Sequence, residues 1–518
     1  MGQMLAGNLV TFSTDSVGNI NNIIVPKNTL GLPIYQGISV IVFGDSMTHR
    51  INSTPSVANG AVAITRASGV ATVVIANHGM GSGQIADINN AADSTFNLRN
   101  VAVTAVNANT LSYACPGADT SAVSVATKTI VFTNQSEMTD CAYWWWLQSK
   151  TQGAFRLVRN SGVASNTSAD MTVRLSADVL AYASDWIFYQ VPLYNDVVNA
   201  GYTAAQIIVY SQAMLAQMLA AGRKVLLIGP PAMSTGLTAA RIEIYLEVMK
   251  WMQLQAQTLS GVYFSDTFFY SVDPINATPG TARANVLLGD NVHESPLGSE
   301  RKAQAIVDAI GGLIPKVQRL VTSNADNYGA SSNNDNIWDY GPWTNAGGVI
   351  VGAGVSGVAP SGFTCSANLS ALGTAVYSCP VGTDGVGYSI QGVLTSTGAS
   401  NYLVIQQTSS IPGARFTAGN KIRLVFRFKL TNVAGSNLQN INAQIQFGGN
   451  FINTYPLAGA ATNSAMSGWV DGIYTFVGPD LVIPAGSTNF QCWTYFNTSA
   501  AGSALTVQME RISMRKIS

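Results

Sequence analysis

A largely apolar, β-branched run early in the chain constrains its fold more than any other feature. Residues 37–43 read Gly-Ile-Ser-Val-Ile-Val-Phe and lead directly into Gly44-Asp45-Ser46. A run without regular polar alternation predicts a strand buried on both faces, as in a parallel sheet. We therefore expect an α/β protein in which Ser46 stands at the carboxyl end of such a strand, where open α/β sheets bind their ligands.

Strand and helix signals alternate through the central part of the chain. Three segments have helical spacing, and each is followed closely by a glycine or a proline. The predicted strands are 155–158, 186–191, 224–229 and 262–265, and the predicted helices are 203–221, 238–259 (with Thr238 as N-cap) and 297–313. This alternation predicts a three-layer α/β/α sandwich on a mainly parallel sheet.

Two all-β regions accompany this domain. One segment shows strand-like stretches between Gly, Asn and Asp turns and no helical period, so it predicts a small β module inserted into the α/β pattern. The last third of the chain contains alternating runs such as 421–430 and predicts a β-sandwich of jelly-roll type. The predicted boundaries are an N-terminal arm at 1–36, the α/β domain at 37–58 and 140–315, the inserted β module at 60–135, a linker at 316–337 and the C-terminal β-sandwich at 338–518.

The composition argues against two classes of partner. Only 10% of the residues are charged, the formal net charge is zero and no basic cluster stands out, so we expect no nucleic-acid binding. No apolar run approaches the roughly 18 residues that a membrane-spanning helix needs. The first residues lack the basic and apolar regions of a secretory signal. We therefore expect neither membrane insertion nor a cleaved signal.

The cysteines and histidines are few and scattered. The chain has five cysteines, none of them in a Cys-x-x-Cys pair, and three histidines. This pattern predicts neither a disulfide framework nor a zinc site, and we expect no metal and no cofactor. A single disulfide between Cys365 and Cys379 across a hairpin stays open as an alternative.

A serine after a buried strand and a histidine near the end of the α/β domain supply the chemistry. Asp290-Asn-Val-His293 lies in the loop between the last predicted strand and the last helix, at the carboxyl edge of the sheet. His293 can then act as base for a Ser46 nucleophile, with Asp290 orienting the imidazole. His49 is too close to Ser46 on the same segment, and His78 lies in the inserted module. Taken alone, the Gly-Asp-Ser triplet also fits a simple capped turn.

These two motifs resemble the first and last sequence blocks of the SGNH/GDSL hydrolase family. The last block extends from Asp290 through His293-Glu-Ser-Pro-Leu to Gly298. Two segments between them, 160–167 and 193–196, resemble the family's second and third blocks in the same order. The resemblance covers about 37–58 and 140–315, and it implies an SGNH-type serine esterase.

The resemblance also implies roles for individual residues. The triad would be Ser46, Asp290 and His293, and the oxyanion hole would use the N–H groups of Ser46 and Ser165 and the side-chain amide of Asn195. Such donors stabilise the oxyanion of ester cleavage by roughly 3–4 kcal/mol each. Ser165 and Leu193 stand where the family usually has glycine, so the local turns depart from the family pattern. A turn or helix cap is the alternative for Asn195.

The inserted module is similar to a small β module found repeatedly in bacteriophage tail and other virion proteins. The similarity lies in segments such as 64–72, 78–79 and 109–113. It implies a tailspike or tail fibre: a homotrimer in the virion that contacts other tail components. The expected function is an esterase that removes O-acetyl groups from a host surface polysaccharide. The alternatives are a secreted, extracellular bacterial SGNH esterase or lipase with a carbohydrate-binding domain, and a non-enzymatic receptor-binding fibre.

The tryptophans are expected to be core residues more often than platforms for sugar rings. They include the run Trp144-Trp145-Trp146 and, in the C-terminal region, Trp338, Trp343, Trp469 and Trp493. The C-terminal domain is expected either to bind carbohydrate or to form the tip of a trimer.

All four blocks lie outside the inserted module and before residue 320. Removal of 60–135, or of everything after about 320, is therefore expected to leave hydrolysis of small esters measurable. Because the insertion joins the chain just after the nucleophile, we expect it to lie at the active-site edge and shape the cleft.

Overall fold

The structure is a computed structural model of the 518-residue chain. It describes residues 2–5, 8–14, 20–24, 37–49, 57–59, 63–75, 78, 80–89, 91, 93–98, 101–124, 130–134, 138–139, 141–314, 345–369, 373–383, 385, 387–398, 401–407, 411–412, 417–447, 450–453, 456–457, 466–487, 489–502 and 504–516. The predicted linker at 316–337, Trp338 and Trp343 lie outside the described residues.

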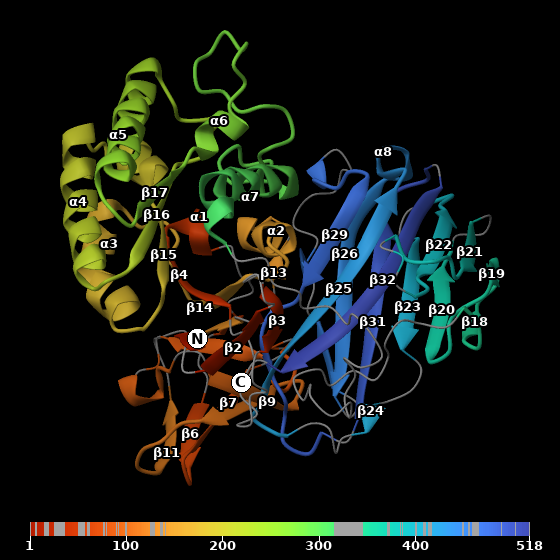
Figure 1. Cartoon of the computed structure of the whole chain (residues 1–518). Helices are drawn as coiled ribbons and strands as arrows, with labels where there is room; N and C mark the ends of the chain where they lie inside the picture. The colour runs from red at the N-terminus through yellow and green to blue at the C-terminus, as the bar shows by residue number, and fades with distance from the viewer. Residues whose placement is uncertain are drawn as a thin grey trace.

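A five-stranded parallel sheet forms the centre of the α/β domain (Figure 1). Its strand order is β14-β4-β15-β16-β17, and each neighbouring pair is parallel. The apolar run at 37–43 forms the buried strand that it predicts, since Val40, Val42 and Phe43 are 0% exposed. The bounds are Phe155–Gly162 (β14), Ile38–Gly44 (β4), Trp186–Gln190 (β15), Lys224–Ile228 (β16) and Val262–Ser265 (β17).

Helices cover both faces of this sheet, which confirms the predicted three-layer α/β/α sandwich. α3, α4 and α5 pack on the face that carries Ile41 and Phe43, whereas α2 and α7 pack on the face that carries Val40 and Val42. Thr238 caps α5 as predicted. The bounds are Ser46–His49 (α1), Tyr143–Lys150 (α2), Ser168–Leu175 (α3), Ala204–Ala220 (α4), Ala239–Thr258 (α5), Thr267–Ser271 (α6) and Pro296–Ile310 (α7), with π-turns at Ser176–Leu180 and Asn195–Asn199 and a 3-10 turn at Gly311–Leu313.

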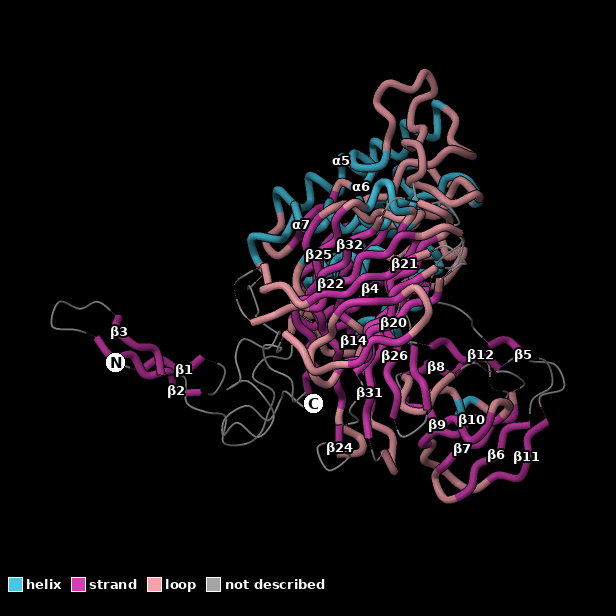
Figure 2. The backbone as a smooth tube through the Cα atoms, turned by 90° about the vertical axis from the view of Figure 1, so that its right-hand side faces the viewer, coloured by secondary structure: helices cyan, strands magenta, loops and turns pink. Residues whose placement is uncertain are grey.

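The insertion forms an eight-stranded antiparallel sheet, which Figure 2 shows as a separate unit. Its order is β11-β6-β7-β10-β9-β8-β12-β5. Ile64, Phe96, Leu111 and Tyr113 belong to a core of its own. The bounds are Val57–Asn59 (β5), Ala63–Ala67 (β6), Val70–Val74 (β7), Ile85–Asn89 (β8), Val101–Asn107 (β9), Thr110–Ala114 (β10), Thr120–Ser124 (β11) and Ile130–Asn134 (β12), with a 3-10 turn at Ser94–Phe96.

The strands of the insertion do not lie at the active-site edge of the sheet, so that expectation is wrong for its described residues. Figure 1 places β6, β7, β9 and β11 away from α1, which follows β4. Ile85 shares a pocket with Arg156 at the amino end of β14. The carboxyl ends of β14 and β4 meet instead at Gly162 and Gly44.

The C-terminal region is the predicted β-sandwich, built from two seven-stranded sheets. We name them the β31 sheet and the β32 sheet after a central strand of each. In the β31 sheet the strands are Val349–Val351 (β18), Phe363–Asn368 (β20), Tyr402–Gln407 (β23), Ile411–Pro412 (β24), Leu438–Phe447 (β26), Asn450–Asn453 (β27) and Asn489–Thr498 (β31). In the β32 sheet they are Val355–Gly357 (β19), Thr374–Ser378 (β21), Ile390–Thr395 (β22), Lys421–Thr431 (β25), Gly472–Val477 (β29), Leu481–Val482 (β30) and Leu505–Lys516 (β32).

Three shorter elements complete the description. The predicted N-terminal arm contains an antiparallel sheet of Gly2–Leu5 (β1), Asn8–Thr14 (β2) and Ile20–Ile24 (β3). Met138–Thr139 (β13) pairs with Pro456–Leu457 (β28) of the C-terminal region. Val433–Ser436 (α8) is a single helical turn between β25 and β26. None of the helices in the described part of the chain is long and apolar enough to span a membrane.

The sandwich and the α/β domain share one apolar core through helix α2. The ring centroids of Trp145 and Trp469 are 5.1 Å apart, and those of Trp146 and Trp469 are 4.7 Å apart. Phe476 of β29 lies 5.9 Å from Trp145. Trp144, Trp145, Trp146 and Trp469 are buried, so the prediction that they are core residues is confirmed. The two domains are one hydrophobic unit although they are far apart in sequence.

The five cysteines are free thiols, so the alternative of a bridge between Cys365 and Cys379 is wrong. Cys365 lies on β20, whereas Cys379 directly follows β21 of the other sheet. A hairpin disulfide needs two cysteines on paired strands, and these two strands belong to different sheets.

Candidate active site

The structure brings Ser46, His293 and Asp290 into one hydrogen-bonded chain. Nε2 of His293 lies 2.9 Å from Oγ of Ser46. Nδ1 of His293 lies 2.7 Å from Oδ2 of Asp290. This is the arrangement of nucleophile, base and orienting carboxylate that characterises serine hydrolases. Residues 247 positions apart in sequence meet at the carboxyl edge of the sheet, where the sequence predicts them.

The loop that holds His293 is a tight turn organised by Asp290. Oδ1 of Asp290 accepts the N–H groups of Val292 at 3.0 Å and of His293 at 2.9 Å. Burial raises the pKa of Asp290, but these two N–H groups and the His293 ring outweigh it and hold the pKa below its usual value. The carboxylate therefore stays ionised and can stabilise an imidazolium on His293.

The turn that presents Ser46 depends on the two residues before it. A Cβ atom at Gly44 would collide with the Thr48 hydroxyl, so the close approach of α1 to β4 requires glycine. Oδ1 of Asp45 accepts the Met47 N–H at 3.0 Å and caps α1. The Ser46 N–H is in the first turn of that helix, where amides have no partner within the helix. It is thus available to a developing oxyanion.

Ser165, the second predicted backbone donor, lies in an exposed turn. Its φ is +63°, in the left-handed region that favours glycine. The structure thus places a serine in the backbone conformation for which the family usually has glycine. Its role as a donor of the oxyanion hole stays a prediction.

Asn195 lies beside the nucleophile turn, but its amide is already engaged. Nδ2 of Asn195 donates to Oδ2 of Asp45 at 3.2 Å and to the main-chain oxygen of Asn166 at 3.0 Å. Its Oδ1 accepts Nδ2 of Asn199 at 2.8 Å. The amide can therefore donate to an oxyanion only by releasing one of its two acceptors. Asn195 holds Asp45 and Asn166 together in the free protein.

Four buried charged residues near the site are missing from the sequence prediction. Burial raises the pKa of Asp45 and the pKa of Asp196 to about 6 each. The two Asp196 oxygens accept the N–H of Ser168 at 2.8 Å and its hydroxyl at 2.6 Å, which ties the Asn195 turn to α3. Lys302 on α7 is 0% exposed, and its ammonium donates to Glu294, next to His293, at 2.9 Å. The only sequence signal for three of these residues is that each adjoins a predicted site residue; they are Asp45, Asp196 and Glu294.

Of the other two histidines, only His78 has a described side chain, and it does not contribute to this site. Nε2 of His78 lies 2.7 Å from the main-chain oxygen of Asn107, and its Nδ1 accepts the Met80 N–H at 3.1 Å. His78 is therefore a buried structural residue of the insertion. The side chain of His49 lies outside the described residues. Among the residues that the structure describes, no group of three or more His, Cys, Asp or Glu could hold a metal ion.

No protein-family model matches the chain, and no curated protein matches its sequence. Several solved structures are similar to part of this chain. Acetylxylan esterase Axe2 from Geobacillus stearothermophilus is 17% identical, with a TM-score of 0.31, over 55% of this chain and 99% of Axe2. A protein described as lipolytic, of the G-D-S-L family, from Desulfitobacterium hafniense is 14% identical, with a TM-score of 0.30, over 52% of this chain and 98% of its own. A protein described as an acylhydrolase from Bacteroides fragilis is 21% identical, with a TM-score of 0.28, over 33% of this chain and 82% of its own.

Proposed function

We propose that this chain is a serine esterase of the SGNH/GDSL type. The observation that carries the proposal is the hydrogen-bonded chain from Ser46 through His293 to Asp290. Nε2 of His293 accepts the proton of the Ser46 hydroxyl as Oγ attacks the acyl carbon, and the imidazolium then gives that proton to the leaving alcohol. Water, activated by the same histidine, hydrolyses the acyl-serine and releases the carboxylic acid. We expect the N–H groups of Ser46 and Ser165 to donate to the oxyanion.

The experiment that tests this activity is p-nitrophenyl acetate hydrolysis by the purified full chain. Ser46→Ala and His293→Ala should each lower kcat by several orders of magnitude, because triad members act as a unit. Ser176→Ala, which alters an exposed serine at the end of α3, serves as the matched control and should not change it. Turnover that survives Ser46→Ala would refute the proposal.

We further propose that the substrate is an O-acetylated bacterial surface polysaccharide. The β31 sheet supports this proposal because none of its strands carries an Asp, Glu, Lys, Arg or His, whereas β25 and β32 of the other sheet carry several. Trp493 and Tyr495 alternate with buried residues along β31, with ring centroids 6.5 Å apart. The Tyr495 hydroxyl donates to Oε1 of Gln444 at 2.9 Å. Aromatic rings and amides on an uncharged face suit the faces and hydroxyl groups of neutral sugars.

Two measurements test the substrate class. Incubation with O-acetylated polysaccharides should release acetate, observed by NMR, in the wild type and not in Ser46→Ala. The Trp493→Ala variant should be retarded less than the wild type in affinity electrophoresis through a gel that contains the polysaccharide whose deacetylation is observed. Its kcat for p-nitrophenyl acetate should stay unchanged. If acetate is released but Trp493→Ala and the wild type are retarded equally, the proposed esterase activity would stand. The β31 sheet would then be excluded as the polysaccharide-binding face.

We also propose that the protein is a homotrimeric component of a phage tailspike or tail fibre. The resemblance of the insertion to a virion β module supports this setting, as does the low content of charged residues. Light scattering on the full-length protein should give the mass of three chains. A monomer would instead favour the secreted, extracellular esterase, and a trimer without Ser46-dependent turnover would favour a receptor-binding fibre.

A further inference from the structure

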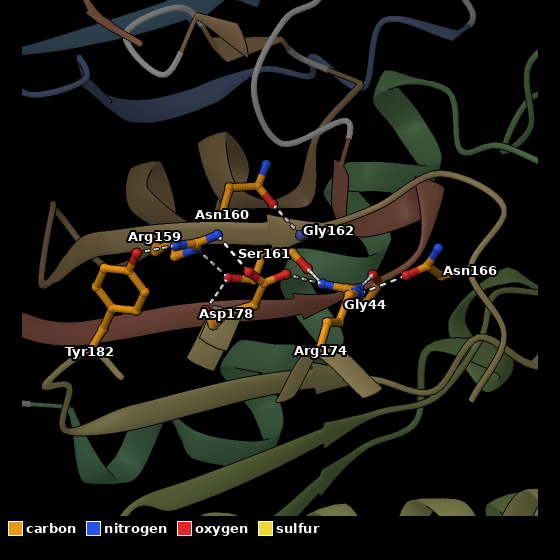
Figure 3. Close-up of polar contacts among 9 residues, drawn as sticks. All are labelled: Gly44, Arg159, Asn160, Ser161, Gly162, Asn166, Arg174, Asp178 and Tyr182. Atoms are coloured by element: carbon orange, nitrogen blue, oxygen red, sulfur yellow. Dashed lines mark hydrogen bonds and ion pairs between the residues drawn. The ribbon is translucent and has the colours of Figure 1, made fainter. Parts of the chain in front are cut away.

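Arg174 on α3 binds three segments that meet at the active-site edge (Figure 3). Its Nη2 donates to the main-chain oxygen of Gly44 at 2.8 Å, and its Nε donates to Oδ1 of Asn166 at 2.6 Å. Its Nη1 donates to the main-chain oxygen of Ser161 at 2.6 Å. One guanidinium therefore joins the end of β4, the end of β14 and the turn that follows β14.

These acceptors adjoin the predicted backbone donors of the oxyanion hole. Gly44 lies two residues before Ser46, and Asn166 directly follows Ser165. The Gly44 oxygen also accepts the Val163 N–H at 3.1 Å, so it already links the nucleophile turn to the second turn. The distance between the Ser46 and Ser165 N–H groups depends on how these two turns are held. The Arg174 guanidinium bonds to both turns, as does the side-chain amide of Asn195.

Other side chains hold the guanidinium in place. Oδ2 of Asp178 lies 3.2 Å from Nη1 of Arg174, and Oδ1 of Asp178 pairs with Arg159 at 3.0 Å. Arg159 also bonds to the hydroxyl of Tyr182. The Phe43 ring lies beneath the guanidinium, with its centroid 4.7 Å from Cζ. Arg174 is thus fixed on several sides, which a group that orients a catalytic turn requires.

Asn166 extends the same network to Asn195. Its side-chain oxygen accepts from Arg174, while its main-chain oxygen accepts from Asn195, which in turn donates to Asp45. The three predicted donors therefore stand on turns that are connected through Arg174 and Asn166.

We propose that Arg174 is the positioning residue of the oxyanion hole, holding the Ser46 and Ser165 turns at the spacing that the transition state requires. The proposal rests on the proposed esterase function. Arg174 acts through the two turns and not on the substrate itself. A fork with three bonded nitrogens is needed, because the single ammonium of lysine does not reproduce its geometry.

The test compares Arg174→Ala and Arg174→Lys with Arg223→Ala. Arg223 is a matched control because it also donates to two main-chain oxygens, those of Ser184 at 2.6 Å and of Tyr182 at 3.3 Å, outside the site. Arg174→Ala should lower kcat about 10- to 100-fold with less than about a threefold change in KM, because misplaced donors weaken transition-state binding selectively. Arg174→Lys should lower kcat nearly as much as Arg174→Ala does. Added ethylguanidinium should restore part of the kcat of Arg174→Ala. Arg223→Ala should keep the wild-type kcat.

The outcomes separate this proposal from the proposed function. If the wild type shows no Ser46-dependent turnover, both are refuted. If it does, and Arg174→Ala keeps the kcat of Arg223→Ala, only the role of Arg174 is refuted. Should Arg174→Ala fail to fold, Arg174→Lys and Asn166→Ser decide the matter. Wild-type kcat in both would overturn the proposal, whereas a shared fall in kcat at unchanged KM would support it.

Discussion

The two all-β regions of this chain relate to the catalytic domain in opposite ways. The insertion interrupts the α/β domain in sequence, yet Ile64, Phe96 and Leu111 form a core of their own. The sandwich begins after the last helix of that domain, yet its apolar interior is continuous with Val40, Trp144 and other residues beneath the catalytic sheet. Position in the sequence therefore does not indicate which region the catalytic fold depends on; the shared core does.

The largest expected effect follows from removal of the sandwich. Truncation after residue 320 would expose Trp145 and Trp146, which are otherwise covered by Trp469. We expect the truncated chain to lose its cooperative thermal transition in near-ultraviolet circular dichroism, although the positions of the sequence motifs alone predict that it stays active. A soluble, cooperatively folding fragment with normal ester turnover would show that the two domains are independent.

A single substitution in the core that the sandwich shares with the α/β domain should strongly destabilise both domains. Trp145→Ala should reduce the free energy of unfolding by about 3–5 kcal/mol, the usual cost of truncating a buried aromatic residue. Tyr113→Ala is the matched change in the core of the insertion. In calorimetry, Trp145→Ala should lower the midpoint temperature at which the α/β domain unfolds. Tyr113→Ala should lower the midpoint temperature of a separate transition, that of the insertion. If both variants shift one common transition, the insertion is not an independent unit.

The active-site edge has a pH signature of its own. Burial raises the pKa of Asp45 from 3.8 to about 6, so the folded chain holds this proton more tightly than the unfolded chain. Stability then falls as pH rises from about 4 to about 6, by about 3 kcal/mol for this group. Urea denaturation at pH 4 and pH 7 should show that the free energy of unfolding falls less in Asp45→Asn than in the wild type. The wild-type fall in stability between pH 4 and pH 7 should persist when the insertion is deleted. Its loss in the deletion variant would contradict the independence of the insertion from the α/β domain.

Deletion of residues 57–134 should have the smallest effect. Strands β6, β7, β9 and β11 of the insertion lie away from α1 (Figure 1). Ile85 shares a pocket with Arg156 at the amino end of β14. We therefore expect kcat/KM for p-nitrophenyl acetate to stay within about twofold of the wild type. A fall of more than about tenfold would mean that the insertion contributes to the site after all.

Much of the catalytic domain is visible in the sequence because its signals are local. The apolar runs of β4, β15 and β16 and the caps of α4 and α5 mark these elements without tertiary information. The triad is predictable because its residues follow strand ends, which must share one edge of a parallel sheet.

The features that the sequence does not reveal depend on contacts between distant segments. Helix α2 has no apolar period because its tryptophans are buried on every side, and Trp469, which covers them, lies more than 300 residues away in sequence. The bond from Asn195 to Asp45 spans 150 residues, and the bond from Arg174 to Gly44 spans 130. Periodicity and motif spacing carry no information on such pairs.

The most direct test of the proposed triad is to identify the residue that an active-site-directed fluorophosphonate modifies. Ser46 Oγ should displace fluoride from phosphorus, and mass spectrometry of the digested protein should place one label on the peptide that contains Ser46. Labelling should be at least about 100-fold slower in His293→Ala, because Nε2 of His293 accepts the serine proton. A label on another residue, or an equal rate in His293→Ala, would contradict the assignment of Ser46 and His293 as nucleophile and base.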